Sequence, residues 1–518
     1  NSVAGNTVLG ESALDASVSG GNNTAIGKNS LTANTSGTTN TAVGLNSLAA
    51  NTTGASNVAI GAEALDANTT ASNNTAVGKA ALGANTTGAQ NTAVGQDCSK
   101  NTTTGSNNTA IGKNSFFSNT TGGSNTALGT SALYSNTTAS SNVAVGDSAL
   151  VANTTASNNT AVGKAALGAN TTGANNVAVG ANALDSNTTS NNLVAIGFGA
   201  LTNSTGGSNV AVGKDALEAN TSGVQNVAIG TDALTKNTTA NNNTAVGDGA
   251  LSVNTTGGDN TAFGSIALDA NTTGSSNHAF GRDSLGKNTT GTNNCAFGQS
   301  ALSNNTTASN NTAYGSGAMF LSTTGESNSA VGFEAGKSVT TGTGNTFIGK
   351  ESGKDVTTGF TNICVGLDAG KSNSPSGSIT TASNQICLGN NNITNLFCKV
   401  STIQTSDIRD KTDVNDFKFG LSWVEKLRPI TYRWDMRSNY KDGVSDGSKK
   451  EEKLHLGFIA QEELEIEKEH GFANNKNDML LVNENNDGNY GMHYDRLVPI
   501  LVNAIKELSA KVTALEAG

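Results

Sequence analysis

The chain has 518 residues, with 30 Lys and Arg against 40 Asp and Glu, a formal net charge of −10 and only 4% aromatic residues. The acidic balance and the lack of basic clusters argue against a nucleic-acid partner, because binding to the phosphate backbone requires positively charged side chains. No run of about 18 apolar residues occurs, so we expect no membrane insertion. The five Cys have no CxxC spacing, and we interpret them as reduced and structural, with no metal site and no cofactor.

Charge divides the chain into two dissimilar parts. Residues 401–518 carry 37 charged side chains in 118 positions, whereas residues 1–400 carry 33 in 400, and both Trp residues follow residue 400. We therefore expect a long, weakly charged part and a compact C-terminal domain. Because the first residue is Asn1 and not Met, we also expect that an N-terminal attachment segment is missing.

The first part is built from a repeat of 17 residues. Variants of the phrase N-T-A-V-G recur 23 times, with one step of 16 residues from Gly197 to Gly213 and a longer last step from Gly366 to Gly389. The segment 191–193 before the short step departs from the pattern, and we expect it to disturb the register. A fixed period of this kind is typical of solenoids.

The chemistry of one unit predicts a coil of a parallel β-roll. The residues on either side of the central Ala alternate with it, as in Val58-Ala59-Ile60, which predicts a short strand with one buried face. Asn-Thr-Thr-Gly supplies a turn. Asn recurs at one coil position, where stacked amides can bond from coil to coil; examples are Asn34, Asn51, Asn68 and Asn85.

Each coil offers only three or four apolar side chains, so a single chain would have a thin core. Association of several copies around a shared axis would cover more apolar surface, and we expect a homotrimer. We place a repetitive β-roll shaft at 1–372, a neck or cap with the last repeat copy at 373–405, and a separate domain at 406–518. The fold class is thus mainly β, with a small α+β domain at the C-terminus.

The repeat resembles the head repeats of trimeric autotransporter adhesins, whose units carry a similar N-x-V-A-I-G strand. The resemblance covers roughly residues 1–390, and it implies a trimeric left-handed β-roll without fixing its cross-section.

Three blocks after the shaft carry a second resemblance: Thr405-Ser406-Asp407-Ile408-Arg409-Asp410-Lys411, His455-Leu456-Gly457-Phe458-Ile459-Ala460-Gln461-Glu462, and residues 490–501. In this order they resemble the intramolecular chaperone auto-processing domain of phage tailspikes, tail fibres and endosialidases. The resemblance covers residues 406–518.

That resemblance implies an autoproteolytic serine peptidase that breaks the Thr405–Ser406 bond in a single turnover, with Ser406 and Lys411 as a catalytic Ser–Lys dyad. A lysine that is desolvated at a subunit interface can serve as the base that a serine hydroxyl needs. The supporting motif residues are Asp407, Arg409, His455, Gln461 and Glu462. His455 has an alternative interpretation as a packed histidine at the start of a strand. Attack by Ser406 on its own preceding carbonyl and activation of a water molecule both remain open.

The last segment, 495–515, is predicted to be a helix. Its apolar stripe suits a short coiled coil between three chains, although packing on its own domain is the alternative. The stripe comprises Leu497, Leu501, Ala504, Leu508 and Leu515, widened by Ile505 and Val512. We expect Trp423, Trp434 and Phe458 to form the core of this domain.

Together these features predict a viral, phage-like tail fibre or appendage protein. Its trimeric shaft would bind a host cell-surface receptor, a glycan or a protein, and would join other virion tail proteins through the missing N-terminal segment. It would assemble in the host cytoplasm and reside in the virion. The alternative is a bacterial surface adhesin or a Thr-rich ice-binding β-solenoid without proteolysis.

Overall fold

The computed structural model describes residues 3–16, 18–393, 406, 408–437, 440, 443–485 and 488–518. The chain divides into two compact units, Asn1–Thr324 and Gly325–Gly518. The fold is mainly β, as predicted from the repeat: a long parallel β-solenoid of 17-residue coils is followed by a small domain that ends in a helix.

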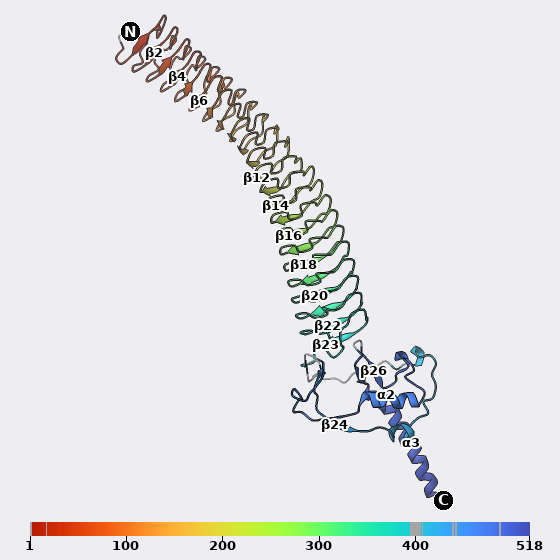
Figure 1. Cartoon of the computed structure of the whole chain (residues 1–518). Helices are drawn as coiled ribbons and strands as arrows, with labels where there is room; N and C mark the ends of the chain where they lie inside the picture. The colour runs from red at the N-terminus through yellow and green to blue at the C-terminus, as the bar shows by residue number, and fades with distance from the viewer. Residues whose placement is uncertain are drawn as a thin grey trace. The chain divides into compact units, whose positions relative to one another are not determined.

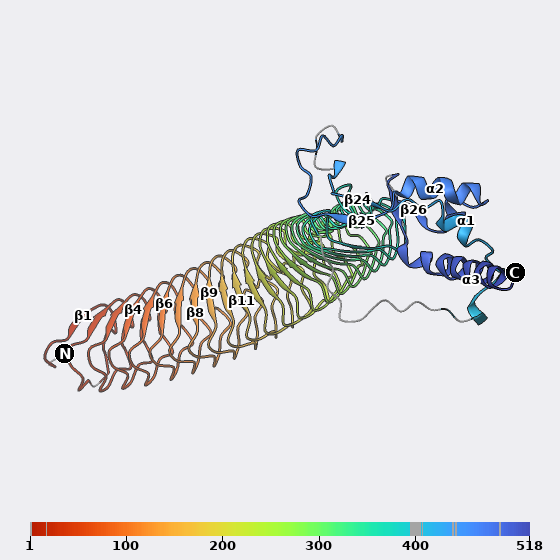
Figure 2. The ribbon, with the colours of Figure 1, turned by 90° about the horizontal axis from the view of Figure 1, so that it is seen from below.

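Twenty-three strands of three residues each form one parallel sheet, and successive coils lie one above another (Figures 1 and 2). They are β1 (Thr7–Leu9), β2 (Thr24–Ile26), β3 (Thr41–Val43), β4 (Val58–Ile60), β5 (Thr75–Val77), β6 (Thr92–Val94), β7 (Thr109–Ile111), β8 (Thr126–Leu128), β9 (Val143–Val145), β10 (Thr160–Val162), β11 (Val177–Val179), β12 (Val194–Ile196), β13 (Val210–Val212), β14 (Val227–Ile229), β15 (Thr244–Val246), β16 (Thr261–Phe263), β17 (His278–Phe280), β18 (Cys295–Phe297), β19 (Thr312–Tyr314), β20 (Ser329–Val331), β21 (Thr346–Ile348), β22 (Ile363–Val365) and β23 (Ile386–Leu388).

The short step in the repeat leaves the sheet intact. Strands β12 and β13 pair in the regular register, with Val194 opposite Val210. The missing residue belongs to the turn, where Thr205 is followed directly by Gly206 instead of by a second Thr. Leu193 does not disturb the register either: it is fully buried, and its N–H donates to Oδ1 of Asn176 at 2.9 Å. The expected disturbance was therefore wrong, because both irregularities are absorbed outside the strands.

The interior of each coil is filled by small side chains. The middle residue of every strand from β2 to β23 is buried, and it is Ala except in β21, β22 and β23. In the coil of β5, Ala76 lies inside with Leu82, Asn85 and Asn91. The first and third residues of most strands point outward and are only half-buried. The buried face of the strand is thus the alanine face.

Asparagine amides link the coils in two ladders. The predicted ladder is confirmed: Nδ2 of Asn68 donates to Oδ1 of Asn51 at 2.9 Å, and Asn85 donates to Asn68 at 3.0 Å. A second ladder, which the sequence analysis missed, precedes each strand. There the backbone N–H of Asn74 donates to Oδ1 of Asn57 at 3.0 Å, and the same pattern recurs in most coils. Buried amides satisfied in this way add to the stability that the small apolar interior of each coil supplies.

The glycine after each strand is required by the backbone. At Gly78, φ is +135°, and a Cβ there would lie 2.4 Å from the carbonyl oxygen of Gly95 in the next coil. Only glycine tolerates both conditions. Leu82, four residues on, also has a left-handed φ of 50° but is fully buried, so its packing compensates for the strain of that conformation.

The small C-terminal domain has three α-helices, two antiparallel strand pairs and three 3₁₀ turns among its described residues. These are η1 (Ile408–Asp410), α1 (Leu421–Val424), β24 (Ile430–Tyr432), β25 (His455–Gly457), α2 (Ala460–Glu469), η3 (Lys476–Asp478), β26 (Val482–Glu484), β27 (Tyr490–Met492), η4 (Tyr494–Arg496) and α3 (Leu497–Glu516).

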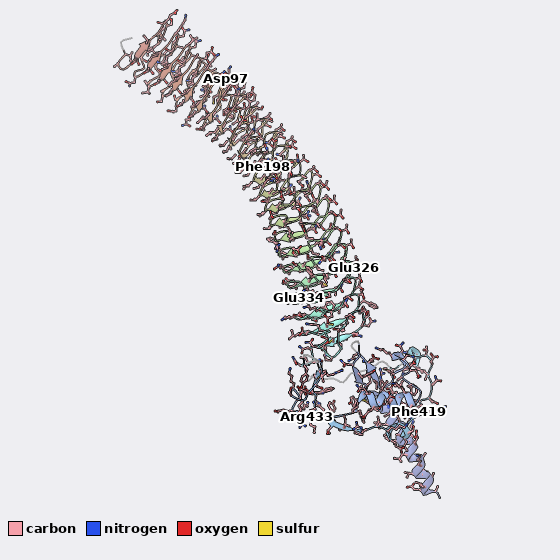
Figure 3. All side chains as sticks on the ribbon, viewed as in Figure 1. Asp97, Phe198, Glu326, Glu334, Phe419 and Arg433 are labelled. Carbon is pink, nitrogen blue, oxygen red and sulfur yellow. The ribbon has the colours of Figure 1, made fainter. Side chains whose placement is uncertain are left out.

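The core of this domain forms around Trp423, which is fully buried with Ile466, Leu481 and Ile500. Phe458 packs against this cluster, as does Phe419, which Figure 3 labels. The predicted core is therefore right for Trp423 and Phe458. It is wrong for Trp434, which is 45% exposed and meets Tyr432 edge-to-face, because the β24 strand that precedes it pairs with β25 alone.

Helix α3 has two apolar faces. Leu497 and Ala504 are buried in the domain, together with Ile500. The remaining positions of the predicted stripe stay exposed, including Leu501, Leu508 and Leu515 together with Ile505 and Val512. The stripe is thus divided: its N-terminal half packs partly on its own domain, and its outer face is left without cover in the single chain.

Candidate functional site

A tight turn brings Ser406 and Lys411 together. The 3₁₀ turn η1 lies between them, and the backbone N–H of Lys411 donates to the carbonyl of Ile408 at 3.2 Å. The chain thereby folds back, and Nζ of Lys411 lies 2.8 Å from Oγ of Ser406. This is the distance at which an amine can exchange a proton with a hydroxyl group.

Both members of this pair are exposed in the single chain, and so is Arg409 on the turn between them. Thr405 and Asp407, the predicted residues on either side of Ser406, lie outside the described residues. The described part of the site is therefore a surface turn with a preformed Ser–Lys contact.

His455 begins β25 and sits in a small aromatic cluster. Its ring stacks on Tyr432, with centroids 5.6 Å apart, and Trp434 lies 6.4 Å away. Its buried Nε2 has no hydrogen-bond partner among the described residues, although Glu451 Oε2 lies at 3.7 Å. His455 makes no hydrogen bond or ion pair with Ser406 or Lys411, so the structure does not join it to the dyad.

Gln461 and Glu462 lie in the first turn of α2, and both side chains are exposed or nearly so. Glu462 forms a forked ion pair with Arg428, whose Nε donates to Oε2 at 3.1 Å and whose Nη2 donates to Oε1. A carboxylate held in this way anchors α2 to the loop before β24. Glu462 therefore has a structural role in its ion pair with Arg428.

Two buried carboxylates of α2 were not singled out in the sequence. Glu467 accepts three backbone N–H bonds at 2.6–2.9 Å, from Leu480, Leu481 and Val482, and so fixes the start of β26. One turn earlier, Glu463 accepts the indole N–H of Trp423 at 2.7 Å. Their four-residue spacing within an acidic run was the available signal, since it places both on one helix face.

The described residues contain no group of three or more His, Cys, Asp or Glu arranged to hold a metal ion. None of the helices in the described ranges is long and apolar enough to cross a bilayer.

Comparison with known families matches residues 406–472 to the family model described as "chaperone of endosialidase", an autoproteolytic chaperone domain. The match begins at Ser406 and ends at Phe472, so it includes the first sequence block from Ser406 onward and the whole of the second block. No curated protein matches the chain. The C-terminal match and the β-solenoid together fit a tailspike or fibre that carries a C-terminal chaperone domain with self-cleaving activity.

Proposed function

We propose that the chain is a phage tail fibre or appendage protein, a homotrimeric shaft for attachment to a host cell-surface receptor. Its C-terminal domain would direct trimer folding in the host cytoplasm and then cleave itself from the shaft between Thr405 and Ser406. The observation that carries the proposal is the 2.8 Å contact between Lys411 Nζ and Ser406 Oγ, at the first residue of the matched family region. The mature shaft would join other tail proteins in the virion.

The chemistry needs only a hydroxyl and a base. In one route, Ser406 Oγ attacks the Thr405 carbonyl carbon while neutral Lys411 takes the hydroxyl proton and passes it to the leaving amine of Ser406. The resulting ester is then hydrolysed, which leaves a carboxylate on Thr405 and a free amine on Ser406. In the other route, the Ser406–Lys411 pair activates the water that attacks the same carbonyl. Either route gains from holding nucleophile and scissile bond in one chain.

Exposure of the pair in the single chain connects cleavage to assembly. A lysine can accept a proton only as a neutral amine, and burial away from water favours that form. Packing of neighbouring chains around the turn would supply that burial. We therefore propose that cleavage waits for trimer formation.

Two apolar faces of the single chain support a trimer. In every strand of the solenoid the third residue is Val, Ile, Leu, Phe or Tyr, and no outward strand position holds Asp, Glu, Lys or Arg. Ile60, Ile111 and Ile196 are each about 40% exposed there. The outer face of α3 is the second apolar face. Contiguous exposed apolar surface is a common mark of a protein–protein interface.

A terminal chaperone meets a particular need of this shaft. Nearly identical coils can pair one repeat out of register at little cost, so alignment must be imposed from outside the repeat. Removal of the chaperone afterwards would leave a shaft whose persistence is kinetic, since separated chains could no longer realign.

The proposal is tested by intact mass measurement of the expressed chain and of three variants. The wild type should yield two species that join at Thr405/Ser406, and Ser406→Ala should yield one full-length species. Lys411→Arg should also stay uncleaved, because arginine keeps the charge but cannot act as a base. Lys418→Ala, an exposed lysine in the same matched region, is the control and should be cleaved normally. A fragment ending at Thr405 from Ser406→Ala or Lys411→Arg would refute the dyad.

The alternative of an ice-binding solenoid requires threonine hydroxyls that are free to order water. In the turn, Oγ1 of Thr52 donates to the carbonyl of Thr69 at 3.0 Å, and Thr86 donates to Thr103 at 3.1 Å. These two hydroxyls form hydrogen bonds between coils and are not free to order water, which favours the fibre over the ice-binding solenoid. A thermal-hysteresis assay tests the alternative directly.

A further inference from the structure

Four consecutive strands carry a ladder of aromatic rings on the outward face of the sheet. It comprises the third residues of β16–β19, namely Phe263, Phe280, Phe297 and Tyr314 (β16 and β18 are labelled in Figure 1). Successive ring centroids lie 5.3, 4.3 and 4.4 Å apart, and the planes differ by only 3–12°. In every other strand, this position holds Val, Ile or Leu. The ladder is therefore a unique mark on an otherwise uniform face.

The rings are poorly covered by their own chain. Phe263 is 41% exposed and Tyr314 is 48% exposed, while Phe280 and Phe297 are half-buried. Strand pairing fixes their spacing, because Phe263, Phe280 and Phe297 stand opposite one another in the register. The ladder is thus held rigidly, with its outer side in solvent.

The stacking decides what can cover these rings. A sugar that binds an aromatic side chain lies on the ring face, but the faces within this ladder are occupied by the neighbouring rings. What remains outward is the ring edges, which pack well against the rings and edges of another aromatic set. Two further copies of this chain, each with the same ladder at the same height, offer such a surface.

We infer that the aromatic ladder is a register key of the trimer, through which the three chains recognise one another's alignment at β16–β19. The inference rests on the proposed homotrimer and deepens it. When the three chains are in register, their three ladders meet at the level of the same four coils, β16–β19. When one chain slips along the axis, rings at the end of its ladder face Val246 or Val331 of the other chains, and their own places are left with cavities.

This key complements the chaperone. The C-terminal domain can align the chains from one end, but β16 begins 145 residues before Ser406 along the chain (406 − 261). Between β2 and β15, successive strands differ only in Thr or Val at the first position and in Val, Ile or Leu at the third. The aromatic ladder differs strongly from the neighbouring strands. It can therefore fix the alignment of the three chains in a region where the nearly identical coils cannot.

The test uses two full-length chains expressed together. In the shifted chain the ladder moves three coils toward the N-terminus, by Val212→Phe, Ile229→Phe, Val246→Phe, Phe280→Val, Phe297→Val and Tyr314→Val, with Phe263 kept. Wild-type chains carrying a small mass tag are co-expressed with the shifted chain, and native mass spectrometry counts the four trimer species. Tagged and untagged wild type serve as the control and should mix in the statistical ratio of 1:3:3:1.

We expect the wild-type and shifted chains to form mainly their own homotrimers, with each mixed species at least about tenfold below its statistical share. Statistical mixing would overturn the inference and leave the rings as a surface for another ligand, while the trimer itself would stand. A monomeric wild type would overturn both proposals. If the shifted chain alone forms no trimer, the ladder-free chain, with Val at all four positions, replaces it and should be excluded from wild-type trimers in the same way.

Discussion

Trp423 donates its indole N–H to Oε1 of Glu463 at 2.7 Å, and both side chains are buried in the centre of the C-terminal domain. Oε2 of the same carboxyl group has no hydrogen-bond partner among the described residues. Burial is the largest cause that raises the pKa of Glu463 to about 7; the bond from Trp423 lowers it, and the charge of Glu467 raises it. The carboxyl group thus stays protonated well above the pH at which it would ionise in an unfolded chain.

This contact makes the stability of the domain depend on pH. Because the folded pKa is above the unfolded value of 4.5, the folded state binds more protons between those two values, and the free energy of unfolding falls as the pH rises. We expect a loss of about 1–3 kcal/mol between pH 5 and pH 8. Denaturant unfolding followed by tryptophan fluorescence measures it, since both Trp residues belong to this domain.

Glu463→Gln should remove that pH dependence while its amide oxygen still accepts from Trp423. The variant should match the wild type at pH 5 and exceed it at pH 8. Glu452→Gln, an exposed position in the same domain, is the matched control and should behave like the wild type. If Glu463→Gln loses stability with pH as steeply as the wild type, the carboxyl group does not titrate as stated.

Gly180→Ala should disrupt the shaft locally. The residue has a φ of +137°, and a Cβ would lie 2.3 Å from the carbonyl oxygen of Gly197 in the next coil. We expect a cost of about 3 kcal/mol or more, because both the backbone strain and the clash must be relieved by separating coils. Calorimetric unfolding measures it. Gly258→Ala, at a turn position where other coils carry Ala or Ser, should change the transition by less than about 1 kcal/mol.

Asn68→Ala should cost about 2–4 kcal/mol. The substitution removes the bonds of Nδ2 to Asn51 and to the carbonyl of Ala71, and it deprives Asn85 of an acceptor. The partners left behind are buried and cannot turn to water. Asn68→Ser should cost less, since Ser204 holds the same ladder position and its Oγ accepts from Asn220 at 3.3 Å. Equal costs for the two substitutions in thermal unfolding would contradict the ladder's role.

Leu508→Asp should prevent both trimer formation and cleavage. Leu508 is 52% exposed on the outer face of α3, so the single domain tolerates a charge there, whereas three buried carboxylates in a shared interface would cost several kcal/mol. On one sample, sedimentation measures trimer formation and intact mass measures cleavage. Ser509→Asp places the same charge beside the stripe and should remain trimeric and cleaved. Efficient cleavage of a monomeric Leu508→Asp chain would separate cleavage from assembly.

The candidate dyad came from the resemblance of three sequence blocks and not from the spacing of Ser and Lys alone. Ser406 and Lys411 lie five residues apart, and the turn at 408–410 brings their side chains into contact. His455 lies at the start of a strand, as its alternative interpretation held, but its neighbours could not be predicted, because Tyr432 in β24 and Trp434 just after it come more than twenty residues earlier. Which strand pairs with β25 is decided by long-range contacts that a local pattern does not contain.

The sequence by itself determined the 17-residue coil, the parallel solenoid and the asparagine ladder, because a fixed period imposes the same local environment on every copy. Only the tertiary structure decided which side of the strand faces inward. Closing a coil of 17 residues leaves room for Ala76 beside Leu82 and the amides, so the larger Val77 and its equivalents are turned outward. The division of the α3 stripe was likewise a matter of packing: Trp423 and its neighbours cover one side of the helix, and the other side stays exposed.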